Sequence, residues 1–418
     1  MQNIVILGAG FGGLRAAMKL GRKTKWLAKR GYQVILVDKN SYHTYTPTLY
    51  EVATTSKETA NYLDLKKVNT HPISELLSGY NIQFRQDIVK NIDARKAEVQ
   101  FVNGSSVSYS HLIFALGAKT NYFGIEGLEK KSFTLKNFTD ALDIRDTILD
   151  KIYSTKYNHQ FSIVICGAGP TGVELSAELK EWFSELTKEG TPCDIKITLL
   201  DASPSILSKF DKEVIRKAEK RLKKFGVDIL TKSLVEKIAR DKITLKGDIR
   251  FRYDILIWAG GIEANALTQI LPFQKSGRGI EVEKTLEAKL LDKSTKLGGK
   301  VYVIGDSATF KDSRTRSFVP QMARPAISEG TVAADNVIRN ISGKPKRVFL
   351  PMDYPYVIPV GGKYAIVKIG SFVISGILGW ILKGLIELGY LISIMPLGRA
   401  LKIWYGGLVM FIKNDRLG

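Results

Sequence analysis

Two glycine-rich motifs of the same spacing are the residues of this 418-residue chain best suited to chemistry. The motifs share the pattern G-x-G-x-x-G, and their glycines are Gly8, Gly10 and Gly13 in the first and Gly167, Gly169 and Gly172 in the second. In this pattern the first glycine permits a tight turn, the second lets a pyrophosphate approach the backbone, and the third lets a helix pack closely on a strand. The pyrophosphate would then lie at the positive end of that helix.

An acidic residue follows each motif at the end of the next apolar run. Asp38 follows the first motif and Asp201 the second. Each carboxylate is expected to accept hydrogen bonds from ribose hydroxyls, although both lie beyond the usual offset of about 20 residues from the glycines. At Asp201 a negative charge would repel a 2′-phosphate, which favours NADH over NADPH. Nearby Lys209 would weaken that preference.

The elements around both motifs follow the same order of strand, glycine turn, helix, strand and acid. In the first copy we expect strands at 4–7 and 33–37 around a helix at 14–29. In the second we expect strands at 161–166 and 195–200 around a helix at 173–187. This is the context that confirms a dinucleotide fingerprint. The sequence therefore predicts an α/β fold with two Rossmann-like dinucleotide-binding domains.

Further segments extend these two domains. Apolar strands are expected at 111–116, 253–259 and 300–304, each followed by glycine, and 89–110 alternates polar and apolar residues as in a small antiparallel sheet. The predicted FAD domain is discontinuous and comprises 1–120 and 295–345, the NADH domain comprises 121–294, and a C-terminal membrane-associated segment comprises 346–418.

The sequence resembles the type II NADH dehydrogenases, which are single-chain, non-pumping NADH:quinone oxidoreductases of the two-dinucleotide-domain flavoproteins. The stretch from Asn40 through His43 and Pro47 to Ala53 is similar to the family's N-x-x-H-x-x-x-P-L-L-Y-x-V-A, with Thr48 in place of a leucine. The runs 117–124, 167–174, 258–261 and 305–306 also match family motifs, and 376–380 and 398–404 resemble its membrane-anchoring helices. The resemblance implies FAD in the first domain and NADH in the second.

The resemblance also assigns site residues. Those implied to contact FAD, besides the first motif and Asp38, are Asn40, His43, Gly117, Gly305, Asp306 and Ala323; those implied to contact NADH, besides the second motif and Asp201, are Thr171, Gly260 and Gly261. Glu174 would lie near the nicotinamide and relay protons or position NADH; alternatively it is only a glutamate well placed at a helix N-terminus. His43 would lie near the FAD pyrophosphate or satisfy backbone groups of its loop.

One departure from the family concerns the electron acceptor. The family carries A-Q-x-A-x-Q where quinone and flavin meet, whereas this chain has Arg324 and Ser328 in place of the two glutamines. Arg324 can donate to a quinone carbonyl, and it would also suit an anionic acceptor. Alternatively, it is a helix-end charge that pairs with Glu329.

The cysteine content and the net charge argue against other enzyme classes, a metal site and some binding partners. Cys166 and Cys193 form neither a C-x-x-C nor a C-x4-C pair, which argues against disulfide reductases and sulfide:quinone reductases. No metal site is expected, because soft ligands are too few. The net charge of +21 favours anionic partners. We expect an anionic membrane surface and not nucleic acid, since no nucleic-acid motif is present.

The C-terminal segment supports membrane contact. The 14 residues 369–382 carry no charge, and Lys383 and Glu387 then interrupt the apolar run. A spanning helix needs about 20 apolar residues. We therefore expect interfacial or buried helices, and a peripheral, monotopic protein on the cytoplasmic side of the inner (plasma) membrane.

The predicted activity is hydride transfer from NADH to FAD, followed by transfer of two electrons to a membrane quinone of unknown type, without proton pumping. Two alternatives stay open. One is a soluble NADH:acceptor reductase with a non-quinone acceptor. The other is an NADH-dependent redox sensor whose C-terminal helices dock a protein partner. A homodimer is a further possibility.

Overall fold

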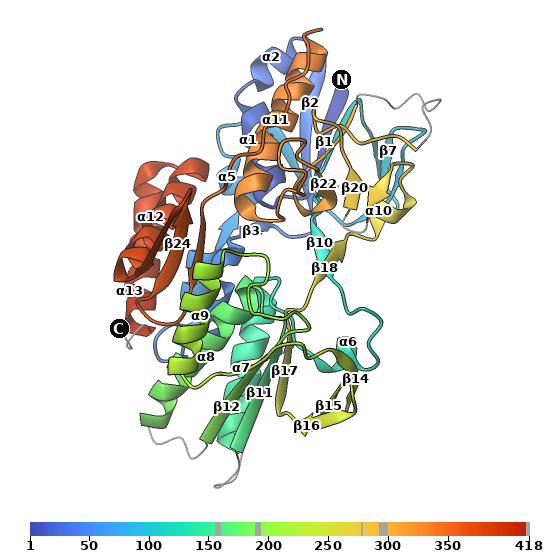
Figure 1. Cartoon of the computed structure of the whole chain (residues 1–418). Helices are drawn as coiled ribbons and strands as arrows, with labels where there is room; N and C mark the ends of the chain where they lie inside the picture. Colours follow the sequence, from blue (N-terminus) through green and yellow to red (C-terminus); the bar gives the residue numbers. More distant parts are fainter. Residues whose placement is uncertain (155–159, 189–193, 277–278, 292–299, 415–418) are drawn as a thin grey trace. The chain divides into compact units, whose positions relative to one another are not determined.

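The computed structural model describes residues 1–154, 160–188, 194–276, 279–291 and 300–414, and it divides into two compact units. Unit 1 comprises Met1–His43, His71–Lys119 and Ile262–Tyr354, and unit 2 comprises Thr44–Thr70, Thr120–Gly261 and Pro355–Gly418. Figure 1 shows the helices and strands of both units and labels many of them.

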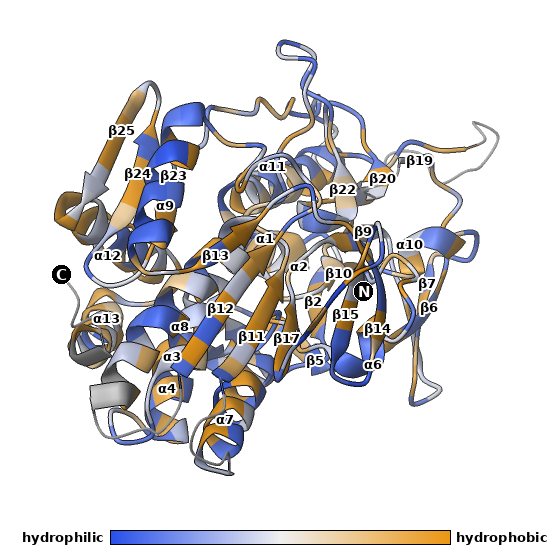
Figure 2. Cartoon of the chain, turned by 60° about the horizontal axis from the view of Figure 1, so that its bottom comes forward, coloured by the Kyte–Doolittle hydropathy of each residue, from blue (hydrophilic) through white to orange (hydrophobic). Residues whose placement is uncertain are grey.

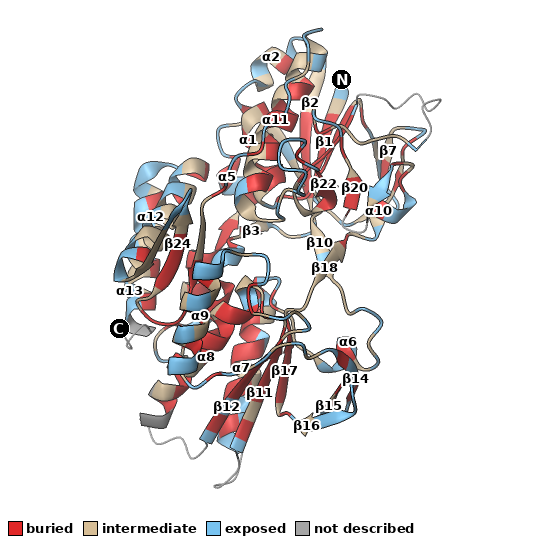
Figure 3. Ribbon diagram, in the orientation of Figure 1, coloured by how far each residue is buried: buried red, intermediate tan, exposed pale blue. Residues whose placement is uncertain are grey.

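Unit 1 is built around a parallel sheet of five strands in the order β21-β9-β1-β2-β5. These strands are β1 (Gln2–Leu7), β2 (Tyr32–Asp38), β5 (Ile82–Gln86), β9 (His111–Phe114) and β21 (Val301–Val303). The strand order reverses between β1 and β9, and ligands of such folds bind at this switch point, outside the carboxyl ends of the strands. Four of the strands, β1, β2, β9 and β21, are largely apolar and mostly buried (Figure 3), as strands covered on both faces are. The edge strand β5 alternates polar and apolar residues and has no buried residue.

The helices of unit 1 are α1 (Phe11–Gly21), α2 (Thr24–Ala28), α5 (Ile73–Leu76), α10 (Leu267–Ile270) and α11 (Ala323–Ile341). The expected helix at 14–29 is therefore two helices, because the chain breaks at Arg22 and Lys23. The segment after residue 300 does return to this unit, since β21 pairs with β9 and α11 packs on α1.

Short strands complete unit 1. The expected antiparallel sheet at 89–110 is present as β6 (Val89–Asp93), β7 (Glu98–Phe101) and β8 (Ser106–Ser108). A second small sheet contains β19 (Lys275–Ser276), β20 (Gly279–Glu281) and β22 (Ala308–Thr309). The chain crosses between the units in or next to β3 (Tyr42–Thr44), β4 (Thr70–Pro72), β10 (Ala118–Thr120) and β18 (Ile262–Ala264).

Unit 2 repeats the same topology with four parallel strands in the order β13-β12-β11-β17. They are β11 (Gln160–Cys166), β12 (Asp194–Leu200), β13 (Asp228–Leu230) and β17 (Ile255–Trp258). The switch point lies between β11 and β17. The helices of this part are α3 (Leu49–Thr54), α4 (Tyr62–Asn69), α6 (Leu128–Lys131), α7 (Phe138–Ser154), α8 (Pro170–Lys188) and α9 (Lys212–Lys224).

The two faces of this sheet are covered differently. Ile163 and Ile165 of β11 belong to a large apolar cluster with α3, α7, α8 and α9. Val164 and Cys166, on the other face, pack on a small antiparallel sheet of β14 (Val235–Ala239), β15 (Lys242–Leu245) and β16 (Ile249–Arg252). Alternate residues of β11 thus serve two separate cores, as the pleat of a strand requires.

Most of the C-terminal segment, Pro355–Gly418, belongs to unit 2 and contains more than the expected helices. It begins with an antiparallel sheet of β23 (Tyr356–Pro359), β24 (Ala365–Ile369) and β25 (Phe372–Gly376), followed by α12 (Ile377–Ile394) and α13 (Leu397–Asn414). The uncharged run at 369–382 is therefore partly strand and partly helix. Gly376, with a φ of +87°, marks the change, since a left-handed backbone favours glycine.

Helix α12 differs from expectation in one respect. By length and composition it is apolar enough to cross a membrane, with 18 residues, a mean hydropathy of 1.7 and only 17% of it buried. Its length is about 27 Å, close to the thickness of a bilayer core. Its Lys383, however, forms an ion pair with Glu51 of α3, and α12 also packs on β24. One side of α12 therefore packs against the rest of unit 2.

The bounds of the two units differ from the expected domain bounds. Residues 44–70 belong to unit 2, because α3 packs on α7 and α8. Residues 262–291 belong to unit 1, because β20 pairs with β22. Of the expected C-terminal segment, Pro355–Gly418 is part of unit 2 and shares its apolar cluster, whereas residues 346–354 belong to unit 1. The expected boundary at residue 295 lies outside the described residues.

The close approach of α11 to α1 gives a stability prediction. A Cβ at Gly330 would lie 2.2 Å from the backbone oxygen of Gly12, so Gly330→Ala must push the two helices apart. We expect a loss of about 1 to 3 kcal/mol, as for other overpacked sites, measured as a lower Tm of the apoprotein. Gly10→Ala is the control, because nothing lies within 4 Å of a Cβ at Gly10. Equal Tm values for both variants would contradict the prediction.

Candidate functional site

The first glycine motif has the geometry that a pyrophosphate requires. Gly8 has a φ of +97°, and a Cβ there would meet the Ala115 oxygen at 2.3 Å. A Cβ at Gly13 would lie 1.8 Å from the Gly8 oxygen, so only glycine lets α1 pack this closely on β1. At Gly10 there is open space at the N-terminus of α1. The first N–H groups of a helix have no partner within the helix, so the N-terminus of α1 beside the open space at Gly10 fits an anionic group.

Asp38 holds this turn from the end of β2. Its carboxylate accepts hydrogen bonds from the Ala9 N–H at 2.6 Å and the Asn40 N–H at 2.8 Å. Burial raises the pKa of Asp38, and these N–H donors oppose the shift. Each carboxylate oxygen retains a lone pair, since a carboxylate has about four acceptor sites. Asp38 can thus hold the turn and still accept from a ribose hydroxyl.

His43 is buried against the same turn. Its Nδ1 lies 2.8 Å from the Ala9 oxygen, and its ring packs edge-on against Phe11 at a centroid distance of 5.1 Å. Burial lowers the pKa of His43 to about 4, so the ring is neutral at neutral pH and donates its Nδ1 proton to that oxygen. Of the two expected roles, the structure therefore supports satisfaction of a backbone group of the loop.

A second turn of unit 1 collects the residues expected at the flavin. Gly305 and Asp306 follow β21 in a short 3-10 helix, and the Gly305 N–H donates to Glu329 of α11 at 2.6 Å. Burial raises the pKa of Glu329 to about 8. The Asp306 carbonyl accepts from Gln321 at 2.9 Å, and the Gly117 carbonyl accepts from Ser307 at 2.9 Å. Gly117, Gly305 and Asp306 are thus brought together in unit 1.

The residues that replace the family glutamines lie at the start of α11. Ala323 is its first residue, Arg324 is exposed, and Ser328 lies one turn later beside the hydroxyl of Tyr354. Glu329 is buried and accepts from Gly305, and the described residues contain no ion pair between it and Arg324. The alternative explanation of Arg324 as the partner of Glu329 is therefore wrong.

The second glycine motif reproduces the first in unit 2. Gly167 has a φ of +110°, a Cβ at Gly172 would lie 1.9 Å from the Gly167 oxygen, and Gly169 faces open space. Asp201, at the end of β12, accepts from the Ala168 N–H at 2.6 Å and the Ser203 N–H at 2.7 Å. Both turns are therefore held by the same pair of backbone contacts to an acid.

The segment after β17 forms the other side of this second turn. Gly260 lies against the ring of Trp258, and Gly261 against that of Phe123, which leaves no room for a Cβ at either glycine. Trp258 donates through its indole nitrogen to the Asn121 oxygen at 2.8 Å. Thr171 is exposed at the start of α8. The structure thus places the predicted NADH-contacting residues around one switch point.

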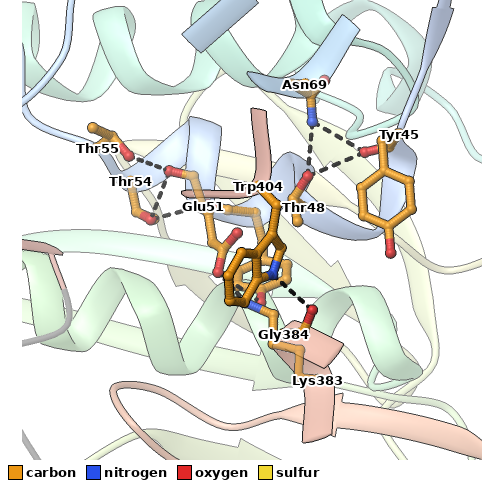
Figure 4. A network of polar contacts seen from close by, with 10 residues as sticks. Tyr45, Thr48, Glu51, Thr54, Thr55, Asn69, Lys383, Gly384 and Trp404 are labelled. Carbon is orange, nitrogen blue, oxygen red and sulfur yellow. Dashed lines mark hydrogen bonds and ion pairs between the residues drawn. The ribbon is translucent and has the colours of Figure 1, made fainter. Parts of the chain in front are cut away.

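Glu174 belongs to a group of charged side chains that the sequence did not predict. Lys383 of α12 and Glu51 of α3 act on the charge of Glu174, and the same two residues act on the charge of Glu387 of α12. Lys383 forms an ion pair with Glu51, whose other carboxylate oxygen, Oε2, is buried with no hydrogen-bond partner. Figure 4 shows this pair beside Trp404, which donates to the Gly384 carbonyl at 2.8 Å. We call Glu51, Glu174, Lys383 and Glu387 the carboxylate cluster.

The carboxylate cluster carries three acids around one ammonium group. Burial raises the pKa of Glu174 to about 8 and that of Glu387 to about 7; in both cases Lys383 opposes the shift and Glu51 adds to it. Near neutral pH, therefore, the cluster holds at least one proton on a carboxyl group. Such perturbed groups are typical of sites that move protons or bind ligands.

A cavity opens beside this cluster. It has a volume of about 180 Å³, and its lining combines the charged residues Glu51, Lys383 and Glu387 with apolar side chains that include Trp380, Trp404 and Phe411. One signal in the sequence points to this cavity, namely the pair of charges at 383 and 387 within an apolar run. Their partner Glu51 lies 332 positions away from Lys383, which no local pattern can indicate.

Only one of the two cysteines, Cys166, lies among the described residues. Cys166 is 1% exposed within β11, and burial raises the pKa of its thiol. It is an inert core residue, as expected. Cys193 lies outside the described residues.

Comparison with known proteins agrees with this geometry. The family model described as pyridine nucleotide-disulphide oxidoreductase matches residues 2–330. The chain is 28% identical to a type II NADH:quinone oxidoreductase of Mycobacterium tuberculosis, covering 94% of this chain and 85% of the relative. It is 27% identical to one from Staphylococcus aureus, covering 96% and 98%.

A solved structure of NDH2 from Plasmodium falciparum in complex with NADH has a similar fold. The TM-score is 0.83 with 19% identity, and the match covers 100% of this chain and 99% of the other. Together these similarities confirm the predicted fold class and the resemblance to type II NADH dehydrogenases noted in the sequence.

The raised pKa of Glu174 gives a prediction for stability. The unfolded glutamate ionises near pH 4.5, whereas the folded one keeps its proton until about pH 8. The unfolded state therefore loses this proton first, and stability falls between these two pH values. Glu174→Gln should remove about 1 to 2 kcal/mol of that loss between pH 5 and 8, seen as a flatter plot of Tm against pH. The control is Glu236→Gln at an exposed position, and identical slopes for both variants would disprove the prediction.

Proposed function

The chain belongs to the pyridine nucleotide-disulphide oxidoreductase family, and we propose that it transfers a hydride from NADH to FAD and two electrons from FAD to a quinone. The observation that carries this proposal is the pair of glycine turns, each held by an acid through the same two backbone contacts. Two such turns in one chain provide for two dinucleotides. When bound, FAD supplies the redox chemistry, accepting a hydride and returning electrons singly or in pairs.

Unit 1 is proposed to hold FAD. The α1 N-terminus and the open space at Gly10 would receive the pyrophosphate, and Asp38 the ribose hydroxyls. Asp306 would bind the ribityl chain, because Glu329 fixes the Gly305 N–H before it. Asn40, His43, Gly117 and Ala323 complete this set. His43 acts by fixing the Ala9 carbonyl and thus the shape of the turn.

Unit 2 is proposed to hold NADH. The pyrophosphate would lie at Gly169 and the N-terminus of α8, with Thr171, Gly260 and Gly261 around it. Asp201 keeps a negative charge at the ribose and disfavours a 2′-phosphate. Glu174, in the first turns of α8, is mostly protonated near neutral pH, so it can donate a proton during turnover.

Arg324 is proposed to contact the acceptor, with Ser328 one turn behind it. It lies in the first turn of α11, where the helix dipole favours anions and disfavours a cation. It is exposed, and the described residues offer it no ion-pair partner. A bound acceptor would explain a cation at this unfavourable position. A quinone suits the role, because its oxygen gains negative charge as it is reduced.

The C-terminal segment is proposed to dock on the cytoplasmic side of the inner (plasma) membrane without spanning it. Many large apolar side chains of α12 and α13 are exposed, namely Ile377, Leu378, Ile381, Leu385, Ile392, Leu397, Leu401, Tyr405, Val409 and Ile412. Such an area exceeds what a soluble monomer commonly exposes. A homodimer or a protein partner would be the alternative cover for this surface.

The activity is tested by supplying the purified protein with NADH or NADPH and a panel of quinones. We expect steady oxidation of NADH, with kcat/KM for NADH at least about tenfold above that for NADPH, since a like-charge contact at Asp201 costs more than about 1.4 kcal/mol. Asp201→Ala should narrow this gap. Asp201→Asn is the matched variant, because it keeps an acceptor for the Ala168 N–H while removing the charge.

Several outcomes would contradict the proposal. A protein that binds both nucleotides but never turns over would be a sensor, and one that reduces only non-quinone acceptors would be a soluble reductase. Equal or better use of NADPH by the unaltered chain would contradict the role of Asp201.

Arg324 gives a separate prediction. Arg324→Ala should slow reoxidation of the flavin by quinone about tenfold to a hundredfold, the scale of losing one donor to a developing charge. Reduction of the flavin by NADH should stay near normal, and stopped-flow absorbance separates the two half-reactions. Lys344→Ala, at another exposed position of unit 1, serves as the control. A defect confined to the NADH half-reaction would show that Arg324 does not serve the acceptor.

A further inference from the structure

Helix α9 of unit 2 carries an unusual concentration of positive charge. Its thirteen residues include seven basic and two acidic side chains. Val214, Ala218 and Leu222 face the core. Lys212, Arg216 and Lys220 recur every four residues on the exposed side. We call these three residues the α9 stripe.

Among the described residues, no acidic side chain neutralises the positive charges of the α9 stripe. Of the two acids on the helix, Glu213 pairs with Lys217 at 3.6 Å and not with the stripe. Among the residues that the structure describes, none forms an ion pair with Lys212, Arg216 or Lys220. Like charges four residues apart destabilise a helix, and Lys212 also stands at the N-terminal end, where the helix dipole disfavours a cation. The stripe therefore lowers the stability of the free protein.

α9 is fastened to the C-terminal sheet along its length. Asp211, directly before the helix, pairs with Lys368 of β24 at 2.6 Å and accepts from Tyr356 of β23 at 2.8 Å. Lys217 donates to Ser375 of β25 at 3.0 Å, and Arg221 donates to the Gly361 carbonyl at 3.2 Å. Figure 2 shows the largely hydrophilic α9 beside this sheet. These contacts place the N-terminal end of the stripe next to the turn between β24 and β25.

That turn exposes apolar side chains. Phe372 is 74% exposed and Ile369 is 43% exposed, on either side of Gly370. Lys368, which precedes Ile369, is the residue that pairs with Asp211. Ile377 and Leu378, at the start of α12 beyond β25, are exposed as well. An exposed aromatic tip and a row of cations therefore adjoin within one unit.

We propose that the α9 stripe and the β24–β25 turn form one docking surface for an anionic lipid bilayer, in which Phe372 enters the headgroup boundary and the stripe contacts lipid phosphates. This inference rests on the membrane docking proposed above and assigns the lipid class and the residues that select it. The combination of basic and apolar side chains is what interfacial surfaces use. A soluble polyanion is less suited, because it would leave Phe372 and Ile369 uncovered.

The proposal is tested by flotation of the full-length, FAD-loaded protein with vesicles of phosphatidylcholine alone or mixed with phosphatidylglycerol. The test variant is K212Q/R216Q/K220Q. The matched control is R240Q/K242Q/K246Q, which removes three exposed charges from the other face of the β11 sheet. NADH oxidation in detergent verifies that both variants are intact.

We expect the unaltered protein and the control to bind anionic vesicles more tightly than neutral ones. The stripe variant should lose about fivefold in affinity for anionic vesicles for each charge that reaches the surface, and its binding should depend less on salt. Its binding to neutral vesicles should not change. Phe372→Ser should weaken binding to both kinds of vesicle.

The possible failures are distinct. If the stripe variant and the control bind anionic vesicles equally, the role of α9 is wrong while membrane docking stands. If the unaltered protein floats with neither vesicle, docking itself fails, and with it this inference. Binding to heparin without binding to vesicles would assign the stripe to a soluble polyanion instead.

Discussion

Both units of this protein depend on how closely a helix can approach the strand before it. At Gly13 and Gly172 a single added carbon would lie within 2 Å of a backbone oxygen, so the third glycine of each motif sets the distance between helix and sheet. That distance places the helix N-terminus over the carboxyl ends of the strands, where Asp38 and Asp201 then hold the turn. The position of each proposed pyrophosphate site follows from this packing constraint.

The parts of the fold that rest on such local constraints could be predicted from the sequence. The glycine spacing, the apolar strands and the acids at their ends each need only a short window of residues. The alternation at 89–110 likewise predicted a small sheet, because period two is a strong signal. The long-range pairing of β21 with β9 could be expected only through the resemblance to a known family.

The C-terminal elements and the roles of several buried polar residues could not be predicted, because they depend on contacts between distant parts of the chain. An apolar run does not distinguish a buried strand from a helix, so β25 and the first turn of α12 were interpreted as one element. Lys383 and Glu387 interrupted that run, yet their purpose depends on Glu51 and Glu174, which other helices supply. His43 shows the same limit, because the chemistry of a histidine depends on burial and on its partner, here the Ala9 oxygen.

The shared core of unit 2 bears on how the protein can be handled in the laboratory. Ile358, Val360 and Ile366 of the C-terminal segment lie in the same apolar cluster as the β11 strand and α8, and Lys383 compensates the buried charge of Glu51. The C-terminal strands and helices are therefore part of the packed core of unit 2 and not a detachable segment. Removing them by truncation would uncover that core and leave a buried carboxylate without its partner. A detergent-free form for crystallisation or screening is better sought by exchanging exposed side chains, such as Leu378 and Tyr405, for polar ones.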